Sequence, residues 1–157
     1  MSVHYDFGLA CDIKPTAPQQ IIDTLKYMAR TEDYEFSNPP RDDLFEGETW
    51  REMLRSGCSY FAGETGAVLR NTLRYIKEKK EASKYTFSFR NCILDDEMGE
   101  YVVFVEWLTQ YSENTGLVGY FRSVYSDHPT LLYFRDGRVY ISEIIGTPKD
   151  IRNGSPW

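Results

Sequence analysis

The feature that most constrains this chain is a strict alternation of apolar and polar residues along its first segment. From Val3 to Ile13 every second residue is apolar, and the residues between them are polar or small. Successive side chains of a β-strand point to opposite faces, so this alternation predicts a strand with one buried face. Tyr85, Phe87 and Phe89 alternate with polar residues in the same way. The chain is therefore expected to form a sheet with one covered face and one polar face.

Each alternating run leads into a segment with helical periodicity. The spacing of apolar residues predicts one amphipathic helix over 21–29 and another over 101–111. Further strands are expected at 116–124 and on both sides of Asp136-Gly137, a dipeptide typical of two-residue hairpins. Residues 67–76 fit both a strand and a helical face, and that choice stays open. The pattern predicts an α+β fold: a two-layer sandwich of mostly antiparallel sheet with two main helices on one face.

The two halves of the chain, about 1–76 and 84–145, resemble each other. Tyr5-Asp6-Phe7 opens one strand and Tyr85-Thr86-Phe87 opens the other, and Ser59-Tyr60-Phe61 is matched with Gly119-Tyr120-Phe121 as a later strand. This suggests a duplicated β-α-β-β unit, with chance similarity between aromatic-rich strands as the alternative. Such a duplicated unit is similar, in architecture only, to bacterial effector-binding domains of the gyrase-inhibitor-like kind. That resemblance concerns the fold and implies little about function.

Residues 31–56 form an acidic insertion in the first half. They hold eight acidic and three basic residues, a net charge of −5. Burial of their aromatic side chains is favourable by about 25 cal/mol per Å² of apolar area, whereas the carboxylates need water. We expect Phe36, Phe45 and Trp50 to pack against the sheet edge or another subunit, and these three residues are the candidates for contact with a partner protein.

Length and charge limit the partners. The 157 residues are predicted to form a single domain, 1–157, as a monomer or homodimer. With 18 basic and 24 acidic residues the net charge is −6, which argues against a nucleic-acid or anionic-membrane binder. Three scattered cysteines, Cys11, Cys58 and Cys92, predict reduced thiols in a cytoplasmic protein.

Motifs for catalysis are not recognisable. His4 and His128 are the only histidines and neither sits in a metal-ligand motif, so no metal, cofactor or catalytic residue is assigned. A glycine-rich phosphate loop and a nucleophile elbow are also absent from the sequence.

The remaining candidate site is the polar face of the predicted sheet. Arginine side chains recognise carboxylate and phosphate through bidentate hydrogen bonds, so several arginines on one face indicate an anion site. Ordinary cross-strand ion pairs are the alternative. The candidate ligand-binding residues are Asp6, Arg70, Arg74, Arg90, Tyr120 and Arg122.

Two function classes follow from these features. The first is a small intracellular binding protein without enzymatic activity, which engages an anionic ligand or a protein partner through the polar sheet face or the acidic aromatic segment. The second is an enzyme with an active site in a cleft between the sheet and residues 31–56. A deep concavity that converges on arginine and an acid or histidine favours a ligand or a reaction, whereas a flat surface favours a protein partner.

Overall fold

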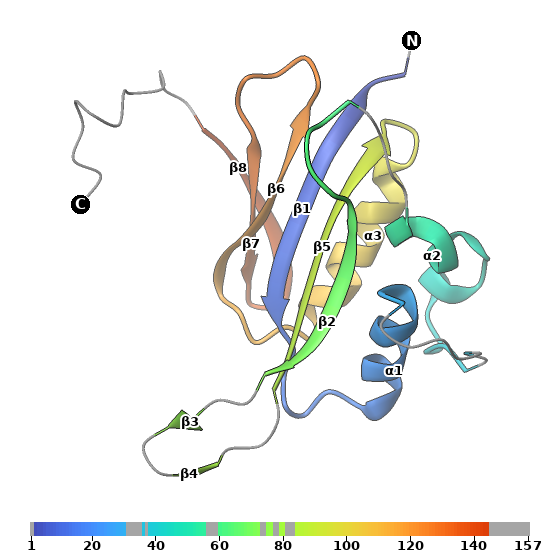
Figure 1. Ribbon diagram of the computed structural model, residues 1–157, viewed down its shortest axis with the longest axis vertical. Coiled ribbons are helices and arrows are strands. Elements are labelled where there is room, and N and C mark those ends of the chain that lie inside the picture. Colours follow the sequence, from blue (N-terminus) through green and yellow to red (C-terminus); the bar gives the residue numbers. More distant parts are fainter. Residues whose placement is uncertain are drawn as a thin grey trace.

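One antiparallel sheet organises the molecule (Figure 1). The computed structural model describes residues 2–30, 36, 38–55, 60–72, 75–76, 79–80 and 84–144. Six strands form the sheet in the order β2-β5-β1-β6-β7-β8. Their bounds are β1 His4–Asp12, β2 Gly66–Thr72, β5 Lys84–Leu94, β6 Gly116–Ser123, β7 Thr130–Arg135 and β8 Arg138–Glu143. A separate two-stranded ladder joins β3, Tyr75–Ile76, to β4, Lys79–Lys80.

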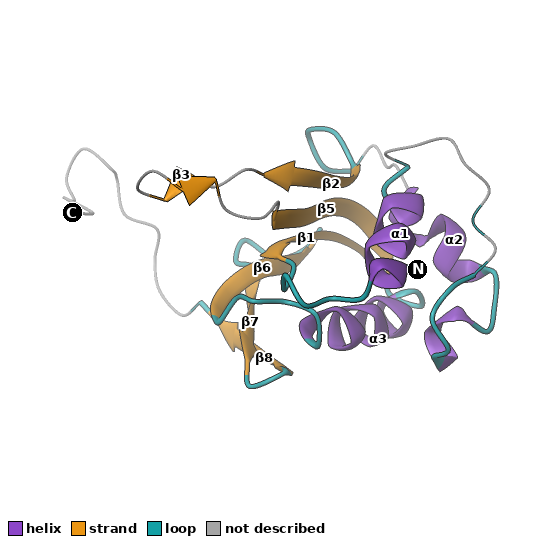
Figure 2. Ribbon diagram, turned by 90° about the horizontal axis from the view of Figure 1, so that it is seen from below, coloured by secondary structure: helices purple, strands orange, loops and turns teal. Residues whose placement is uncertain are grey.

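Helices cover one face of this sheet (Figure 2). The two longer ones are α1, Gln19–Met28, and α3, Met98–Thr109; α2, Thr49–Glu52, has a single turn. Short 3₁₀ turns at Asp43–Phe45 and Met53–Arg55 flank α2. The predicted α+β class is confirmed, with an open six-stranded antiparallel sheet and helices on one side. Residues 66–72 form a strand, which settles the open choice for that part of 67–76.

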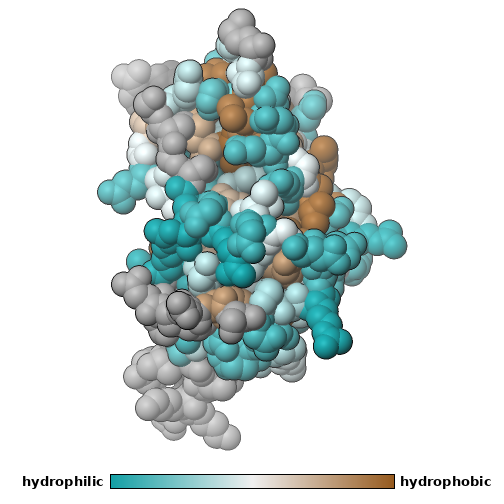
Figure 3. Space-filling view, turned by 90° about the vertical axis from the view of Figure 1, so that its right-hand side faces the viewer, coloured by the Kyte–Doolittle hydropathy of each residue, from teal (hydrophilic) through white to brown (hydrophobic). Residues whose placement is uncertain are grey.

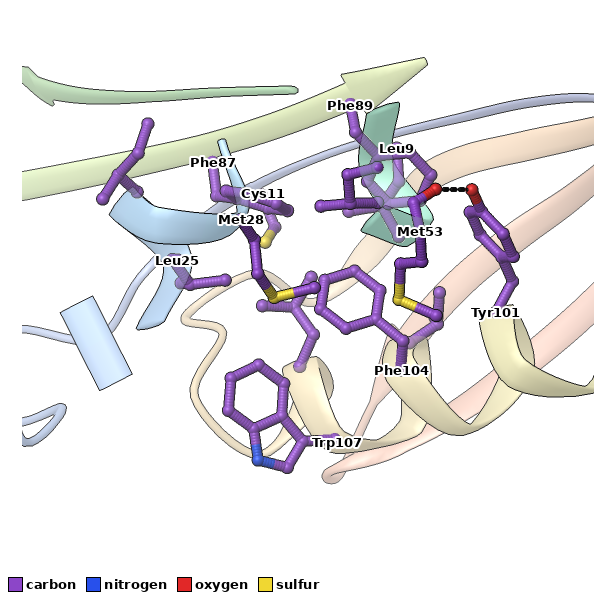
Figure 4. Close-up of a cluster of buried hydrophobic side chains, with 14 of the residues drawn as sticks. Leu9, Cys11, Leu25, Met28, Met53, Phe87, Phe89, Tyr101, Phe104 and Trp107 are labelled. Atoms are coloured by element: carbon purple, nitrogen blue, oxygen red, sulfur yellow. Dashed lines mark hydrogen bonds between the residues drawn. The ribbon is translucent and has the colours of Figure 1, made fainter. Parts of the chain in front are cut away.

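The core lies between the sheet and the helices (Figure 4). Phe7 and Phe87 are 2% and 0% exposed, and Tyr5 and Tyr85 pack at its margin, as the alternation predicts. Phe104 of α3 lies against Phe87 and Phe89 from the sheet, with ring centroids 6.1 and 5.9 Å away. Aromatic rings bury large apolar areas in such contacts, so β1, β5 and α3 form the centre of the hydrophobic core.

A polar contact also anchors the segment before β2 to the core. Asn91, fully buried on β5, donates hydrogen bonds of 2.8 Å to the Met53 carbonyl and 2.7 Å to the Tyr101 hydroxyl. The Tyr101 hydroxyl donates to the same carbonyl (Figure 4). Buried backbone carbonyls need such partners, and here one carbonyl fixes the turn after α2 on the sheet.

The strand order is symmetric with respect to two β-α-β units, one formed by β1, α1 and β2 and the other by β5, α3 and β6. In β2-β5-β1-β6, exchanging β1 with β5 and β2 with β6 returns the same order reversed. Tyr5 and Tyr85 are 80 residues apart in the sequence. Leu9 and Phe89 are also 80 residues apart, and they lie opposite each other in β1 and β5, so exchanging the two units leaves this pair in place. The strand equivalent to β6 is therefore β2. The expected match with residues 59–61 is wrong, since Tyr60 and Phe61 lie in a bend and Ser59 falls outside the described residues.

The β7–β8 hairpin turns at the predicted dipeptide. Asp136 and Gly137 both have positive φ, at 52° and 70°. Two successive residues in this conformation form a type I′ turn, whose twist matches that of the strands it joins. Arg135 and Arg138 flank it as the first pair of the ladder.

The described part of the acidic segment is an ordered layer on the helices. Phe45 contacts Trp107 of α3, and Trp50 contacts Tyr27 of α1, with ring centroids 5.1 and 5.5 Å apart. These aromatic side chains pack against the helices. The sequence pattern instead predicts packing against a sheet edge or another subunit. The carboxylates of this layer stay exposed, and the molecular face that carries α1 and α2 is mostly hydrophilic (Figure 3). The exposed acids are Asp42, Asp43, Glu46, Glu48 and Glu52.

Two further expectations concern the cysteines and the membrane. Cys11 is a free thiol, but Cys92 is disulfide-bonded, so the expectation of three reduced thiols is wrong. Disulfide pairing depends on which segments of the chain the fold brings together, and the spacing of the cysteines in the sequence does not reveal it. The cysteine argument for a cytoplasmic location therefore no longer holds. Among the described residues, no helix has the length and apolar character needed to cross a membrane.

A pair of glycine substitutions tests the packing of β6 on β1. A Cβ at Gly119 would lie 2.2 Å from the Gly8 carbonyl oxygen, so Gly119→Ala should destabilise the protein by about 3 kcal/mol. Gly99 in α3 has open space around it, so Gly99→Ala should instead stabilise by roughly 0.5–1 kcal/mol. Urea unfolding measures both, and equal effects of the two substitutions would contradict the register of β1 and β6.

Candidate functional site

The strand registers place one set of alternate side chains on the face opposite the helices. Asp6 lies opposite Arg122 of β6, and Gly8 lies opposite both Arg90 of β5 and Tyr120 of β6. Residues directly opposed in an antiparallel ladder share a face, so these side chains gather on the polar face.

Asp6 is the centre of this cluster. Its side chain is only 6% exposed, and Arg90 binds it through two hydrogen bonds. Arg90 Nε donates to Asp6 Oδ1 at 2.8 Å, and Nη2 donates to Oδ2 at 3.0 Å. This is the bidentate arrangement that guanidinium and carboxylate groups favour. The hydrogen bonds to Asp6 raise the pKa of Arg90, which stays charged.

Two more side chains complete the surroundings of Asp6. Arg122 Nη2 lies 3.8 Å from Asp6 Oδ2, an ion pair too long for a hydrogen bond. The Tyr120 hydroxyl donates to the same oxygen at 3.3 Å. Burial of the phenol and the nearby Asp6 charge both raise the pKa of Tyr120, so it remains a neutral donor. Two cations face one carboxylate, and the cluster carries a net positive charge.

The loop over residues 60–65 covers this end of the polar face. Tyr60 stacks on His4 with ring centroids 4.0 Å apart, and the Arg122 guanidinium lies 5.5 Å from the Phe61 ring centre. Arg90 Nη1 donates to the Ala62 carbonyl at 2.8 Å. The loop satisfies a donor of Arg90 that an incoming anion would otherwise use. Arg90 is therefore committed to contacts within the chain.

Glycine makes room for Tyr120. A Cβ at Gly8 would lie 2.9 Å from a carbon of the Tyr120 ring, so the ring lies over the β1 backbone. An aromatic side chain over a strand glycine covers backbone that would otherwise be exposed. Strand alternation predicts Tyr120 on this face, whereas the role of Gly8 depends on the pairing of β1 with β6 and has no local sequence signal.

A basin of about 490 Å³ opens on the polar face away from Asp6. Arg70 and Val68 of β2 border it, together with Ser88 and Thr86 of β5. The other lining residues are Ala10, Cys11, Asp12, Phe87 and Asn114. Arg70 is exposed and makes no hydrogen bond or ion pair with the described part of the chain. The basin thus presents an available guanidinium beside two hydroxyl side chains.

The structure divides the predicted arginines into two groups. Arg90 lies opposite Gly66 on β2, whereas Arg70 lies four residues further along that strand, roughly 13 Å away. Arg90 and Arg122 therefore belong to the Asp6 cluster, and Arg70 belongs to the basin. Arg70 and Arg122 are equivalent under the exchange of the two units, because Arg70 lies opposite Thr86 as Arg122 lies opposite Asp6. Arg74 lies outside the described residues.

The predicted partner-contact residues are mostly enclosed within the chain. Trp50 and Phe45 are 1% and 7% exposed, and Phe36 packs against Tyr27. The segment that carries them lies on the helix side of the sheet, so its described part does not border the polar face. The cleft suggested for an active site, between the sheet and residues 31–56, is not formed by that described part.

The sequence pattern did not predict some contacts of the site. The aromatic residues at 59–61 favour a strand, so the sequence did not indicate the loop contacts of Phe61, Ala62 and Gly63 with the arginines. A Cβ at Gly63 would lie 2.5 Å from Arg90 Nη1, and its φ is +101°, so the glycine itself is the available signal of close backbone approach. Asn114 was also missed; its side-chain oxygen accepts a hydrogen bond from the Asp12 amide.

Metal-binding and thiol chemistry find little support in the described chain. Its residues contain no group of three or more histidine, cysteine, aspartate or glutamate side chains placed to hold a metal ion. Burial raises the pKa of Cys11 to about 12, so this thiol is neutral at physiological pH.

Comparison with known proteins adds no family and no relative: no family model, curated protein or solved structure matches this chain. The site is therefore interpreted from its geometry alone.

Substitution of the two clustered arginines tests how much each one stabilises the fold. Arg90→Met should cost about 2 kcal/mol, because it leaves the buried Asp6 without its bidentate partner. Arg122→Met should cost about 1 kcal/mol or less, because Arg122 is 39% exposed and further away. Chemical unfolding of both variants measures the difference, and a larger loss for Arg122→Met would contradict this account.

The protection of Cys11 can be tested by alkylation. At pH 8 its raised pKa lowers the thiolate fraction about a thousandfold relative to a thiol of pKa 9.0. Iodoacetamide should therefore leave Cys11 unmodified in the folded protein and modify it rapidly in guanidinium chloride. Peptide mass spectrometry reads out the label, and rapid native labelling would show that the site opens.

Proposed function

We propose that this protein is a binding protein without enzymatic activity that takes a small carboxylate-bearing ligand in the basin beside Arg70. The observation that carries the proposal is the contrast between two arginines on one face. Arg90 donates three hydrogen bonds, two to the Asp6 carboxylate and one to the Ala62 carbonyl, whereas Arg70 has an exposed guanidinium without a partner among the described residues. A free guanidinium at the edge of a concave surface is suited to bidentate carboxylate recognition.

The rest of the basin supports a small polar ligand. Thr86 and Ser88 place hydroxyl groups on the same face as Arg70, and both are partly buried. The volume of about 490 Å³ lies within the range of small-molecule sites. Ala10 contributes only a methyl group to the lining of the basin, so it takes up little of the basin's volume.

The charge of the basin favours a monoanion. Asp12 also lines it, and its carboxylate repels a second negative charge placed nearby. A ligand with one carboxylate gains the Arg70 contact with less of this repulsion than a phosphate dianion does. The proposal therefore ranks a carboxylate above inorganic phosphate as occupant.

Thermal unfolding with added benzoate tests the proposal. A ligand at ten times its dissociation constant stabilises the folded state by about 1.4 kcal/mol, so the melting temperature should rise with benzoate at constant ionic strength. Arg70→Gln should abolish the rise, whereas Arg135→Gln, at another exposed arginine on β7, should leave it unchanged. Inorganic phosphate should have a smaller effect than benzoate.

The control variant separates a specific site from general ion effects. A rise that persists in Arg70→Gln, or one that Arg135→Gln removes equally, would contradict the proposal. Equal effects of benzoate and sodium chloride would do the same.

A further inference from the structure

An apolar groove lies on the helix side of the sheet, between α3 and the β6–β7–β8 end. It encloses about 340 Å³. Met98, Val102 and Val105 of α3 form one wall, and Leu132, Val139 and Ile141 of β7 and β8 form the other. Figure 2 shows the sheet curling here, so that β7 and β8 come round toward α3. This groove is separate from the basin beside Arg70, which opens on the opposite face.

Apolar side chains are left in water around the groove. Val102 of α3 is 47% exposed, and Ile141 of β8 is 65% exposed. Large apolar side chains gathered on one surface are typical of an interaction site. A helix with apolar residues on nearly all sides is ordinarily buried, and α3 instead keeps this side open.

The edge of the sheet borders the same groove. Among the described residues β8 pairs only with β7, so its outer edge has no strand beside it. In a two-residue hairpin the pair Arg135 and Arg138 exchanges hydrogen bonds, and the pattern alternates from there. The backbone N–H and C=O groups of Val139, Ile141 and Glu143 therefore point outward. Lysine and proline, which commonly protect such edges, are absent from β8, whose charged residues Arg138 and Glu143 stand only at its two ends.

The size of this surface indicates a single extended segment. Six residues of strand are roughly 20 Å long, and the gap between a sheet and a helix layer is about 10 Å, which gives a footprint of about 200 Å². A standard protein–protein interface needs about 800 Å² from each partner. A second copy of the chain joined only here falls well short of that value, whereas one added strand fits the length of β8.

Charge defines the ends of the occupant. Glu106 lines the groove and Glu100 is exposed on the same helix, while α3 contains no basic residue. Glu143 is exposed at the end of β8 on the same face as Ile141, whereas Arg138 at the start of β8 lies on the opposite face of the sheet. These carboxylates favour lysine or arginine on the bound segment.

We propose that β8 and the groove bind an extended peptide of another protein by strand addition, with alternate apolar side chains in the groove and basic residues at its ends. The peptide pairs with the outward backbone groups of β8, and side chains of one face enter between Val102 and Ile141. Main-chain hydrogen bonds supply affinity in this mode, and the groove supplies specificity.

A fluorescein-labelled peptide of sequence Lys-Thr-Val-Thr-Val-Thr-Lys, in which the lysines and valines share one face of the strand, tests the proposal by fluorescence anisotropy with the full chain. It should bind, and the acidic peptide Glu-Thr-Val-Thr-Val-Thr-Glu should bind at least tenfold more weakly. Val102→Ser should weaken binding of the basic peptide, whereas Leu117→Ser, at an exposed apolar residue on β6 outside the groove, should not.

Backbone pairing is tested at Ile141. Ile141→Ala removes the side chain and keeps the outward N–H, so it should weaken binding about fivefold. Ile141→Pro also removes the N–H, which is not used within the hairpin, and should weaken binding at least tenfold more than Ile141→Ala. Should the proline variant unfold, amide exchange of Val139 and Ile141 in the unaltered chain provides the same test, because it should slow when peptide is added.

Three results would overturn the proposal. These are equal binding of the basic and acidic peptides, equal affinities of the alanine and proline variants with no change in amide exchange, and absence of binding by the basic peptide. Native mass spectrometry adds a fourth: a dimer that Ile141→Pro dissociates would assign the edge to a second copy of the chain.

Discussion

The buried carboxylate of Asp6 is the constraint on which the polar half of the structure depends. An ionised group with so little exposure is costly unless hydrogen bonds and an opposite charge compensate for lost water. Arg90 supplies both, and it can do so only because β1 and β5 are neighbours in this register. Its Nη1 donates to the Ala62 carbonyl of the 60–65 loop, so the Arg90 side chain connects the adjacent strands β1 and β5 with the loop above them.

That constraint also decides which part of the polar face is open to ligands. Asp6 occupies the edge of the Arg90 guanidinium formed by Nε and Nη2, so an anion seeking bidentate contacts at that edge would have to displace Asp6. The equivalent arginine of the other unit, Arg70, faces Thr86 where Arg122 faces Asp6. Threonine brings no charge. The difference between an aspartate and a threonine at equivalent positions therefore separates a closed structural cluster from an open basin.

The parts of the fold that sequence predicted depend on local patterns. Alternation gave the faces of β1 and β5, and Asp136-Gly137 gave the hairpin, because side-chain direction and turn conformation follow from neighbouring residues. The Asp6–Arg90 contact needs the order of strands, which a single sequence does not contain. The bend at Tyr60 and Phe61 was mistaken for a strand because aromatic residues are frequent in strands, and here they serve as contacts for His4 and Arg122.

The acidic segment shows why charge alone predicts a surface poorly. Its aromatic residues were assigned to a partner, yet Trp50 and Phe45 extend the core across α1 and α3. A Trp at 1% exposure contributes through burial within the chain, so only the carboxylates of this layer remain for contacts outside it. The exposed apolar side chains that border the groove, Val102 and Ile141, lie instead on α3 and β8, at the opposite end of the helix layer. Burial thus moves the candidate protein-binding surface from the segment richest in charge to the β8 edge of the sheet, where β8 pairs only with β7 among the described residues.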